Sequence, residues 1–176
     1  NLHNNLPCDV SGIWLFKDNH VSVNTLESQD LYLAAYKTSP TFSNDTLAHL
    51  SFKPGEWTKA VLTQKEPEVR KIDGPIGPIA ALLNLPRDHS AITAPLTIGD
   101  EVIGMLTMIH HTAGRYGSES QKITAAFASY AAIAIQNNRL YARSQEQARV
   151  SMILLQVANA IQSLTDLDEL AATIVR

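Results

Sequence analysis

The chain has 176 residues, of which 45% are hydrophobic and 18% charged, and its formal net charge is −3. This length fits one domain with a real apolar core, and the slight negative charge offers no basic surface to nucleic acid. The single cysteine, Cys8, excludes an internal disulfide and a cysteine-based zinc cluster, and no apolar run approaches the roughly 20 residues that span a bilayer. Because no signal peptide is recognisable either, we expect a cytoplasmic chain without direct membrane insertion.

The N-terminal half of the chain predicts short strands separated by turns. Apolar or alternating segments predict strands at Val10–Lys17, Leu31–Tyr36 and Glu68–Ile72, with a turn at Asp18–His20 and a loop at Ser39–Asp45. Between them, Lys53-Pro54-Gly55 opens a short helix over Glu56–Gln64, which Pro67 ends.

A cluster of glycine and proline at Asp73–Pro78 leads into a second short helix, predicted at Ile79–Asn84. Two further strands, Ala91–Ile98 and Val102–His111, are joined by Gly99-Asp100, which suits a tight hairpin turn. Since residues 102–109 are apolar at nearly every position, this strand should be central and covered on both faces.

The last third of the chain predicts one long helix. Ser118 and Gln121 form a capping box, and neither glycine nor proline follows before the cap signal at Thr165-Asp166. At about 1.5 Å per residue, a helix over residues 118–164 would reach about 70 Å, which exceeds the width of a small domain.

The apolar face of this helix is about twice as wide as one core requires, which predicts a second helix as partner. We therefore expect a homodimer through this helix. Its predicted interface residues are Tyr130, Ile133, Ala134, Leu140, Tyr141 and Leu155.

Three segments resemble the GAF domain, a sensory module of signalling proteins. Phe52–Pro67, which includes the predicted short helix, is similar to a segment of the family that runs from a glycine to a proline. Ala91–Leu106 is similar to the family's hairpin around a Pro-Leu pair. Tyr116–Tyr141 is similar to the closing helix of the family. The resemblance covers roughly residues 8–144. The helix that opens the family's fold has no counterpart before the first predicted strand, whereas residues 154–176 resemble the opening helices of another such module.

The resemblance implies an α/β fold of the α+β type, with a central antiparallel sheet of five to six strands, flanking helices and a long C-terminal helix. It divides the chain into a sensor domain, residues 1–144, and a helical linker to a following domain, residues 145–176. It also implies a non-catalytic domain that binds an unknown small molecule and transmits the ligand state through the long helix to an output domain. That output domain could be a histidine kinase of a two-component system or a cyclic-dinucleotide enzyme.

Strand alternation and the resemblance together predict a ligand pocket. Its predicted residues are Trp57, Ile79, Leu82, His89, Thr93, Leu106, Met108 and His110. Arg70 and Lys71 are predicted to be exposed charges on an edge strand, and no metal site is predicted.

Two alternatives stay open, a dimerisation scaffold without ligand and a haem- or bilin-binding redox or light sensor that uses His89 or His110. Against a bilin, residues 73–90, where phytochrome-like members carry the attachment cysteine, contain none. No cofactor is therefore predicted. The acids and serines form no nucleophile–base set, and a single cysteine argues against a sulfoxide reductase of this family, so we predict that the chain is not an enzyme.

Overall fold

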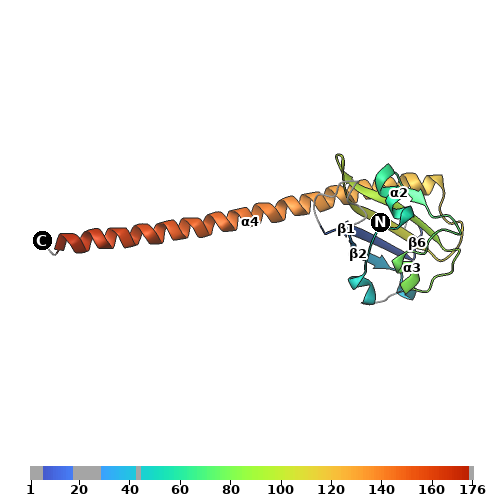
Figure 1. Cartoon of the computed structure of the whole chain (residues 1–176), viewed down its shortest axis with the longest axis horizontal. Coiled ribbons are helices and arrows are strands. Elements are labelled where there is room, and N and C mark those ends of the chain that lie inside the picture. The colour runs from blue at the N-terminus through green and yellow to red at the C-terminus, as the bar shows by residue number, and fades with distance from the viewer. Residues whose placement is uncertain (1–5, 18–28, 43–44, 175–176) are drawn as a thin grey trace. The chain divides into compact units, whose positions relative to one another are not determined.

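The structure, a computed structural model, describes residues 6–17, 29–42 and 45–174. The chain divides into two compact units, residues 1–134 and 135–176. The first unit holds all the described strands (Figure 1), and the described part of the second unit is helical throughout.

Six strands form one antiparallel sheet with the order β3-β2-β1-β6-β5-β4, which confirms the predicted fold. They are β1 (Val10–Phe16), β2 (Leu31–Thr38), β3 (Ser51–Phe52), β4 (Glu68–Val69), β5 (Ser90–Ile98) and β6 (Glu101–His110). Strand β6 lies between β1 and β5 and is buried from Val102 to Ile109, as a continuous apolar run predicts.

Short helices join the strands on one side of the sheet. They are η2 (Pro40–Phe42), η3 (Asp45–His49), α2 (Glu56–Gln64) and α3 (Pro78–Leu82). Gly55 and Gly77 are the N-cap residues of α2 and α3, and Pro78 occupies the first turn of α3, where its missing N–H costs nothing. The bounds of α2 agree with those predicted from the sequence.

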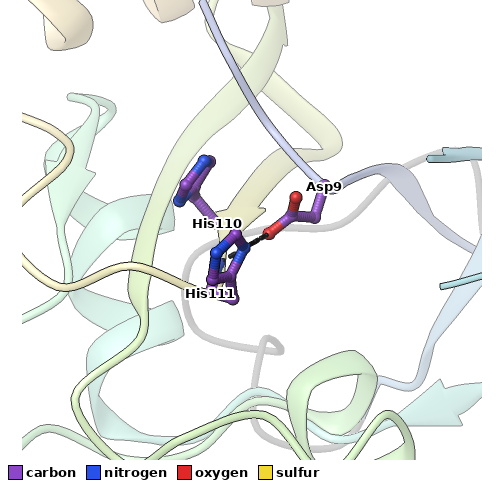
Figure 2. A group of neighbouring side chains, drawn as sticks. All are labelled: Asp9, His110 and His111. Carbon is purple, nitrogen blue, oxygen red and sulfur yellow. Dashed lines mark hydrogen bonds and ion pairs between the residues drawn. The ribbon is translucent and has the colours of Figure 1, made fainter. Parts of the chain in front are cut away.

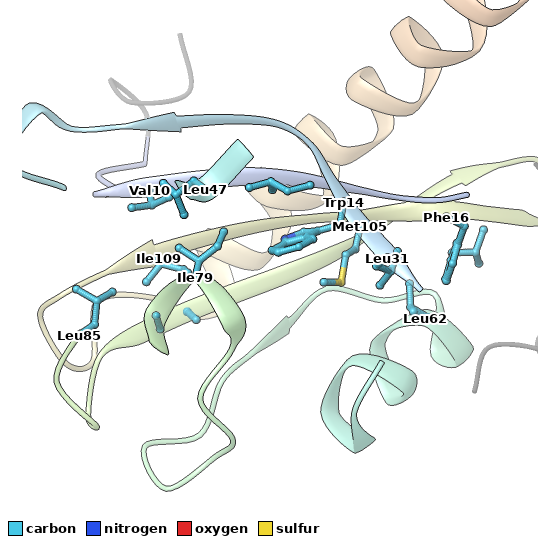
Figure 3. Close-up of a cluster of buried hydrophobic side chains, with 14 residues drawn as sticks. Val10, Trp14, Phe16, Leu31, Leu47, Leu62, Ile79, Leu85, Met105 and Ile109 are labelled. Carbon is cyan, nitrogen blue, oxygen red and sulfur yellow. The ribbon is translucent and has the colours of Figure 1, made fainter. Parts of the chain in front are cut away.

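The alternation of side chains along the strands divides the first unit into layers. Trp14, Met105 and Ile109 point toward α2 and α3 and share a buried cluster with Leu62 and Ile79 (Figure 3). On the opposite face of the sheet, α4 (Ser118–Ile174) packs through Thr124, Ala128 and Ala132, which are fully or almost fully buried at a spacing of four residues. The sheet is therefore covered by α2 and α3 on one face and by the start of α4 on the other.

Two sequence predictions need correction. The strand predicted at Glu68–Ile72 ends at Val69, because the chain turns back at Lys71, whose carbonyl oxygen accepts the N–H of Gly74. The helix end predicted at Thr165-Asp166 is wrong, since α4 continues to Ile174. Threonine and aspartate inside a helix are less favourable than alanine by only about 0.7 kcal/mol each at most, so they do not end it. The turn predicted at Asp18–His20 lies outside the described residues.

No helix in the described part of the chain combines the length and the apolar composition needed to cross a bilayer.

Candidate functional site

A cavity of about 550 Å³ lies between the sheet and its cover of α2 and α3. Its floor comes from the sheet, one wall from the start of α2, and the other wall from residues 68–79. The floor residues are Trp14, Thr93, Met105, Thr107 and Ile109. The volume is within the range of small-molecule and cofactor sites.

Strand alternation decides which predicted pocket residues reach the cavity. Trp57, Ile79 and Thr93 line it. Leu106 and Met108 lie on β6 between floor residues, so their side chains point to the opposite face. Leu106 borders a groove beside α4 there, and the sulfur of Met108 lies 3.9 Å from the Thr124 hydroxyl.

The other three predicted pocket residues are also placed outside the cavity lining. Leu82 packs at the edge of the apolar cluster. The buried His89 donates its Nδ1–H to the carbonyl oxygen of Pro86 at 2.6 Å, and His110 lies beside Asp9 at the end of β6. The position of His89 depends on a loop conformation that the sequence pattern does not specify.

Arg70 differs from its prediction and organises one wall of the cavity. Its side chain is 6% exposed, whereas Lys71 is exposed as predicted. The guanidinium group donates hydrogen bonds to four backbone carbonyl oxygens, those of Gly74, Pro75, Arg87 and His89. Burial lowers the pKa of Arg70 from its ordinary value, with the charge of Asp73 opposing the shift. Arg70 therefore holds together the two loops that flank α3.

Two tryptophans line the cavity, and each has a buried indole N–H without a hydrogen-bond partner. Among the described residues, Nε1 of Trp14 and Nε1 of Trp57 are the buried side-chain nitrogen or oxygen atoms that lack one. Trp14 also makes an edge-to-face contact with Phe52, with 4.8 Å between the ring centroids. Buried polar groups without a partner are rare in native structures, so these two N–H groups need an explanation.

Thr93 and Thr107 add a polar pair to the apolar floor. Their hydroxyl oxygens lie 3.2 Å apart and are buried. One hydroxyl donates to the other, which leaves one hydroxyl proton for a third group.

Asp9, His110 and His111 form the cluster in the described residues that could hold a metal ion, with their ligand atoms within 4.8 Å of one another (Figure 2). Oδ2 of Asp9 accepts hydrogen bonds from the backbone N–H and the Nδ1–H of His111, at 2.6 and 2.7 Å. Nδ1 of His110 accepts the N–H of Thr112 at 3.0 Å. The two bonds between His111 and Asp9 fasten the residue before β1 to the residue after β6.

Burial lowers the pKa of His89 from its ordinary value, against the opposing effect of the bond to Pro86, and the nearby Arg70 lowers it further. Burial lowers the pKa of His110 as well. On acidification these two histidines therefore bind protons in the unfolded chain, near pH 6.5, before they do so in the folded chain. Because the unfolded state binds more protons, acidification lowers the free energy of unfolding.

We expect the urea midpoint of unfolding to fall as the pH is lowered from 7.5 to 5.5. The variant His89→Asn keeps an N–H donor for Pro86 but does not titrate, so its midpoint should depend less on pH. A wild-type midpoint that stays constant or rises on acidification would contradict this prediction.

A second face of the domain is open beside α4. Tyr130, Ile133 and Ala134 are exposed on the first unit, and Tyr130 retains 73% of its accessible surface. In the second unit Leu140, Tyr141 and Leu155 are exposed as well. All six predicted interface residues thus have free apolar surface.

Comparison with known proteins identifies the fold. Residues 15–137 match the family described as GAF domain. A comparison with curated proteins gave no match.

Three solved structures illustrate the similarity. A GAF domain/HD domain protein from Geobacter sulfurreducens has a TM-score of 0.59 and 16% identity, over 79% of this chain and 87% of that one. The red/green cyanobacteriochrome NpR6012g4 has a TM-score of 0.57 and 14% identity, over 80% and 90%. A domain of a putative two-component sensor histidine kinase from Sinorhizobium meliloti has a TM-score of 0.56 and 18% identity, over 81% and 90%. At these sequence identities the likeness establishes the fold alone. The identity of a ligand must be inferred from the residues of the site.

Proposed function

Because the chain belongs to the GAF domain family, we propose that residues 1–144 act as a non-catalytic sensory domain that binds a small molecule in the cavity beneath α2 and α3. The cavity itself carries the proposal. It is mostly apolar, is bordered by two loops that one arginine holds, and is lined by aromatic and aliphatic side chains. A ligand that bound one arrangement of these loops more tightly than another would shift their equilibrium.

We propose that the signal leaves the domain through α4. This helix begins against the face of the sheet opposite the cavity, and the floor strand β6 separates the two. Segment 145–176 would connect to an output domain such as a histidine kinase, the class of protein to which the similar domain from Sinorhizobium meliloti belongs. Coupling requires that the two helix arrangements differ in affinity for the ligand.

Haem and bilin fit the described residues poorly. Neither His89 nor His110 is among the residues that line the cavity. Cys8 is buried with Met108 and Tyr116 on the α4 side of the sheet, and burial raises the pKa of its thiol to about 11. A buried thiol with a raised pKa is a poor nucleophile for covalent attachment. A haem or bilin is therefore the weaker alternative, although the cyanobacteriochrome shares the fold.

Native mass spectrometry of the freshly purified chain, with a visible absorption spectrum of the same sample, tests the proposal. We expect an adduct that disappears on denaturation, because a noncovalent ligand is released when the cavity that holds it unfolds. If no adduct is present and no compound of a metabolite library raises the melting temperature, the scaffold without ligand becomes the better description. Absorption in the visible range would instead favour a tetrapyrrole.

We further propose a homodimer through α4, because the exposed apolar surface of this helix is large for a helix in water. The variant Ala134→Glu places a charge in the middle of the proposed interface, where an unpaired buried charge costs about 3–5 kcal/mol. We expect the variant to be monomeric by light scattering at concentrations where the wild-type chain is dimeric.

The matched control is Ala142→Glu, which makes the same substitution at another exposed position of α4. At about 100° per residue, Ala142 lies about 140° from the middle of the arc that the six predicted interface residues cover. A dimeric Ala134→Glu variant would show that this face is not the interface.

A further inference from the structure

The cluster of Asp9, His110 and His111 lies at one end of the sheet, outside the cavity. Asp9 immediately precedes β1, His110 is the last residue of β6, and His111 follows it. One ligand atom from each residue lies within 4.8 Å of the other two. None of the three is among the residues that line the cavity, so the proposed ligand site does not explain why they are together.

The backbone fixes the position of Asp9. Its N–H donates to the carbonyl oxygen of Ile109 at 2.8 Å, and its own carbonyl oxygen accepts the N–H of Ser39 at 2.7 Å. The side chain is only 13% exposed, and a carboxylate so far out of water needs hydrogen bonds or a positive charge beside it. Asp9 therefore presents one well-placed oxygen ligand whose charge favours a cation.

The segment that carries the two histidines is held in place as well. The Ser90 hydroxyl donates to the carbonyl oxygen of Thr112 and accepts the N–H of Arg115, both at 2.8 Å. The rings of His110 and His111 are stacked, with 4.6 Å between their centroids (Figure 2). Two imidazole rings thus lie next to one carboxylate.

Coordination requires rotations of side chains that have room to rotate. The lone pair of a ring nitrogen lies in the ring plane, so His111 must turn out of the stack, and its side chain is 52% exposed. His110 must give up the exposed hydrogen bond from the N–H of Thr112, which water can replace. Ligand atoms of a tetrahedral Zn²⁺ site lie about 3.4 Å apart, so atoms already within 4.8 Å need only small shifts.

We infer that Asp9, His110 and His111 bind one divalent transition-metal ion such as Zn²⁺, with water completing its coordination. Imidazole nitrogen and carboxylate oxygen are ligands of Zn²⁺, whereas Mg²⁺ and Ca²⁺ prefer oxygen ligands alone. The ion would link the residue before β1 to the end of β6, from which the chain continues into α4 at Ser118. This site is separate from the cavity, so the inference does not depend on the proposed function.

Isothermal titration calorimetry of the full chain with zinc chloride, without a histidine tag, tests the inference. We expect one Zn²⁺ per chain, bound at least about tenfold more tightly than Mg²⁺ or Ca²⁺. Because the three ligands are brought together only by folding, zinc should also raise the melting temperature.

Substitution of each ligand locates the site. Loss of a group that merely orients a ligand costs a metal site about 10- to 100-fold in affinity, so loss of a ligand should cost at least about tenfold. We expect this loss in His110→Ala, in Asp9→Asn and in His111→Ala, with unchanged circular dichroism; His111→Ala changes a half-exposed side chain and is the variant least able to disturb folding. His49→Ala is the control, because it removes an exposed histidine of η3 that is not part of the cluster, and it should bind zinc like the wild-type chain.

Three results would overturn the inference. If the chain binds no Zn²⁺, the cluster is not a metal site. If His110→Ala and His111→Ala bind Zn²⁺ as tightly as the wild-type chain, the ion attaches elsewhere. If Mg²⁺ binds as tightly as Zn²⁺, the class of metal is wrong. None of these results bears on the cavity, because a co-purified ligand of the cavity is detected independently as an adduct by native mass spectrometry.

Discussion

The variant Gly104→Ala is expected to lose about 3 kcal/mol or more of unfolding free energy, because β1 and β6 approach each other too closely at this point for a side chain. A Cβ atom added at Gly104 would lie 2.0 Å from the carbonyl oxygen of Trp14 and 3.0 Å from Cα of Leu15. Both neighbours are backbone atoms of the adjacent strand, so no side-chain rotation relieves the contact.

The effect should extend from the sheet to the cavity. Gly104 pairs with Leu15 of β1 and with Leu96 of β5, so a displacement there disturbs two strand pairs. Trp14, whose carbonyl oxygen would be pushed away, also lines the cavity. Urea unfolding followed by circular dichroism would measure the loss.

Gly117→Ala is the matched control for this substitution, because no heavy atom lies within 4 Å of a Cβ at that position. Its unfolding free energy should change by less than about 1 kcal/mol. If the two variants unfold at the same urea concentration, the close approach of β1 and β6 does not constrain this position.

The elements of the sheet could be predicted from the sequence because their signals are local. The apolar run of β6 and the Gly99-Asp100 turn specify the central hairpin by themselves. The start of α2 follows equally from Gly55, which precedes its first turn. Short pieces such as β3, with two residues, carry no such signal and form only because β2 offers them an edge.

The cavity was predicted less well, because its walls depend on contacts between distant segments. Strand alternation and the family resemblance together predict Trp57, Ile79 and Thr93, and these three residues line the cavity. Leu106 and Met108 show the limit of this reasoning, since an apolar strand with two buried faces gives no periodicity that distinguishes one face from the other. The burial of Arg70 depends on four carbonyl groups that converge from separate loops, and no local pattern encodes that convergence.

Replacing Arg70 by methionine is expected to destabilise the domain by about 3 kcal/mol, because it removes one buried and three partly buried hydrogen bonds to carbonyl groups together with the charge. The affected groups belong to Gly74 and Pro75 before α3 and to Arg87 and His89 after it. Methionine preserves much of the apolar length of the side chain, so the loss would report on the hydrogen bonds and the charge. Urea unfolding would measure it.

Lys71→Met is the control, since it removes a positive charge from the neighbouring, exposed residue and should change stability by less than about 1 kcal/mol. Arg70→Lys keeps the charge, but one ammonium group cannot reach four carbonyl groups. Its unfolding free energy should therefore lie between those of Arg70→Met and Lys71→Met. Equal midpoints for Arg70→Met and Lys71→Met would contradict a stabilising role for Arg70.

Hydrogen exchange distinguishes a local effect of Arg70→Met from a global one. Because Arg70 ties together the loops on both sides of α3, residues 72–88 should exchange faster in the variant even under conditions where β5 and β6 stay protected. The same loops form a wall of the cavity, so a ligand that orders them would slow their exchange. Arg70 would then determine how much binding free energy is needed to order this wall. A sensory domain must control this ordering cost, because it determines how strongly ligand binding changes the conformation of the loops.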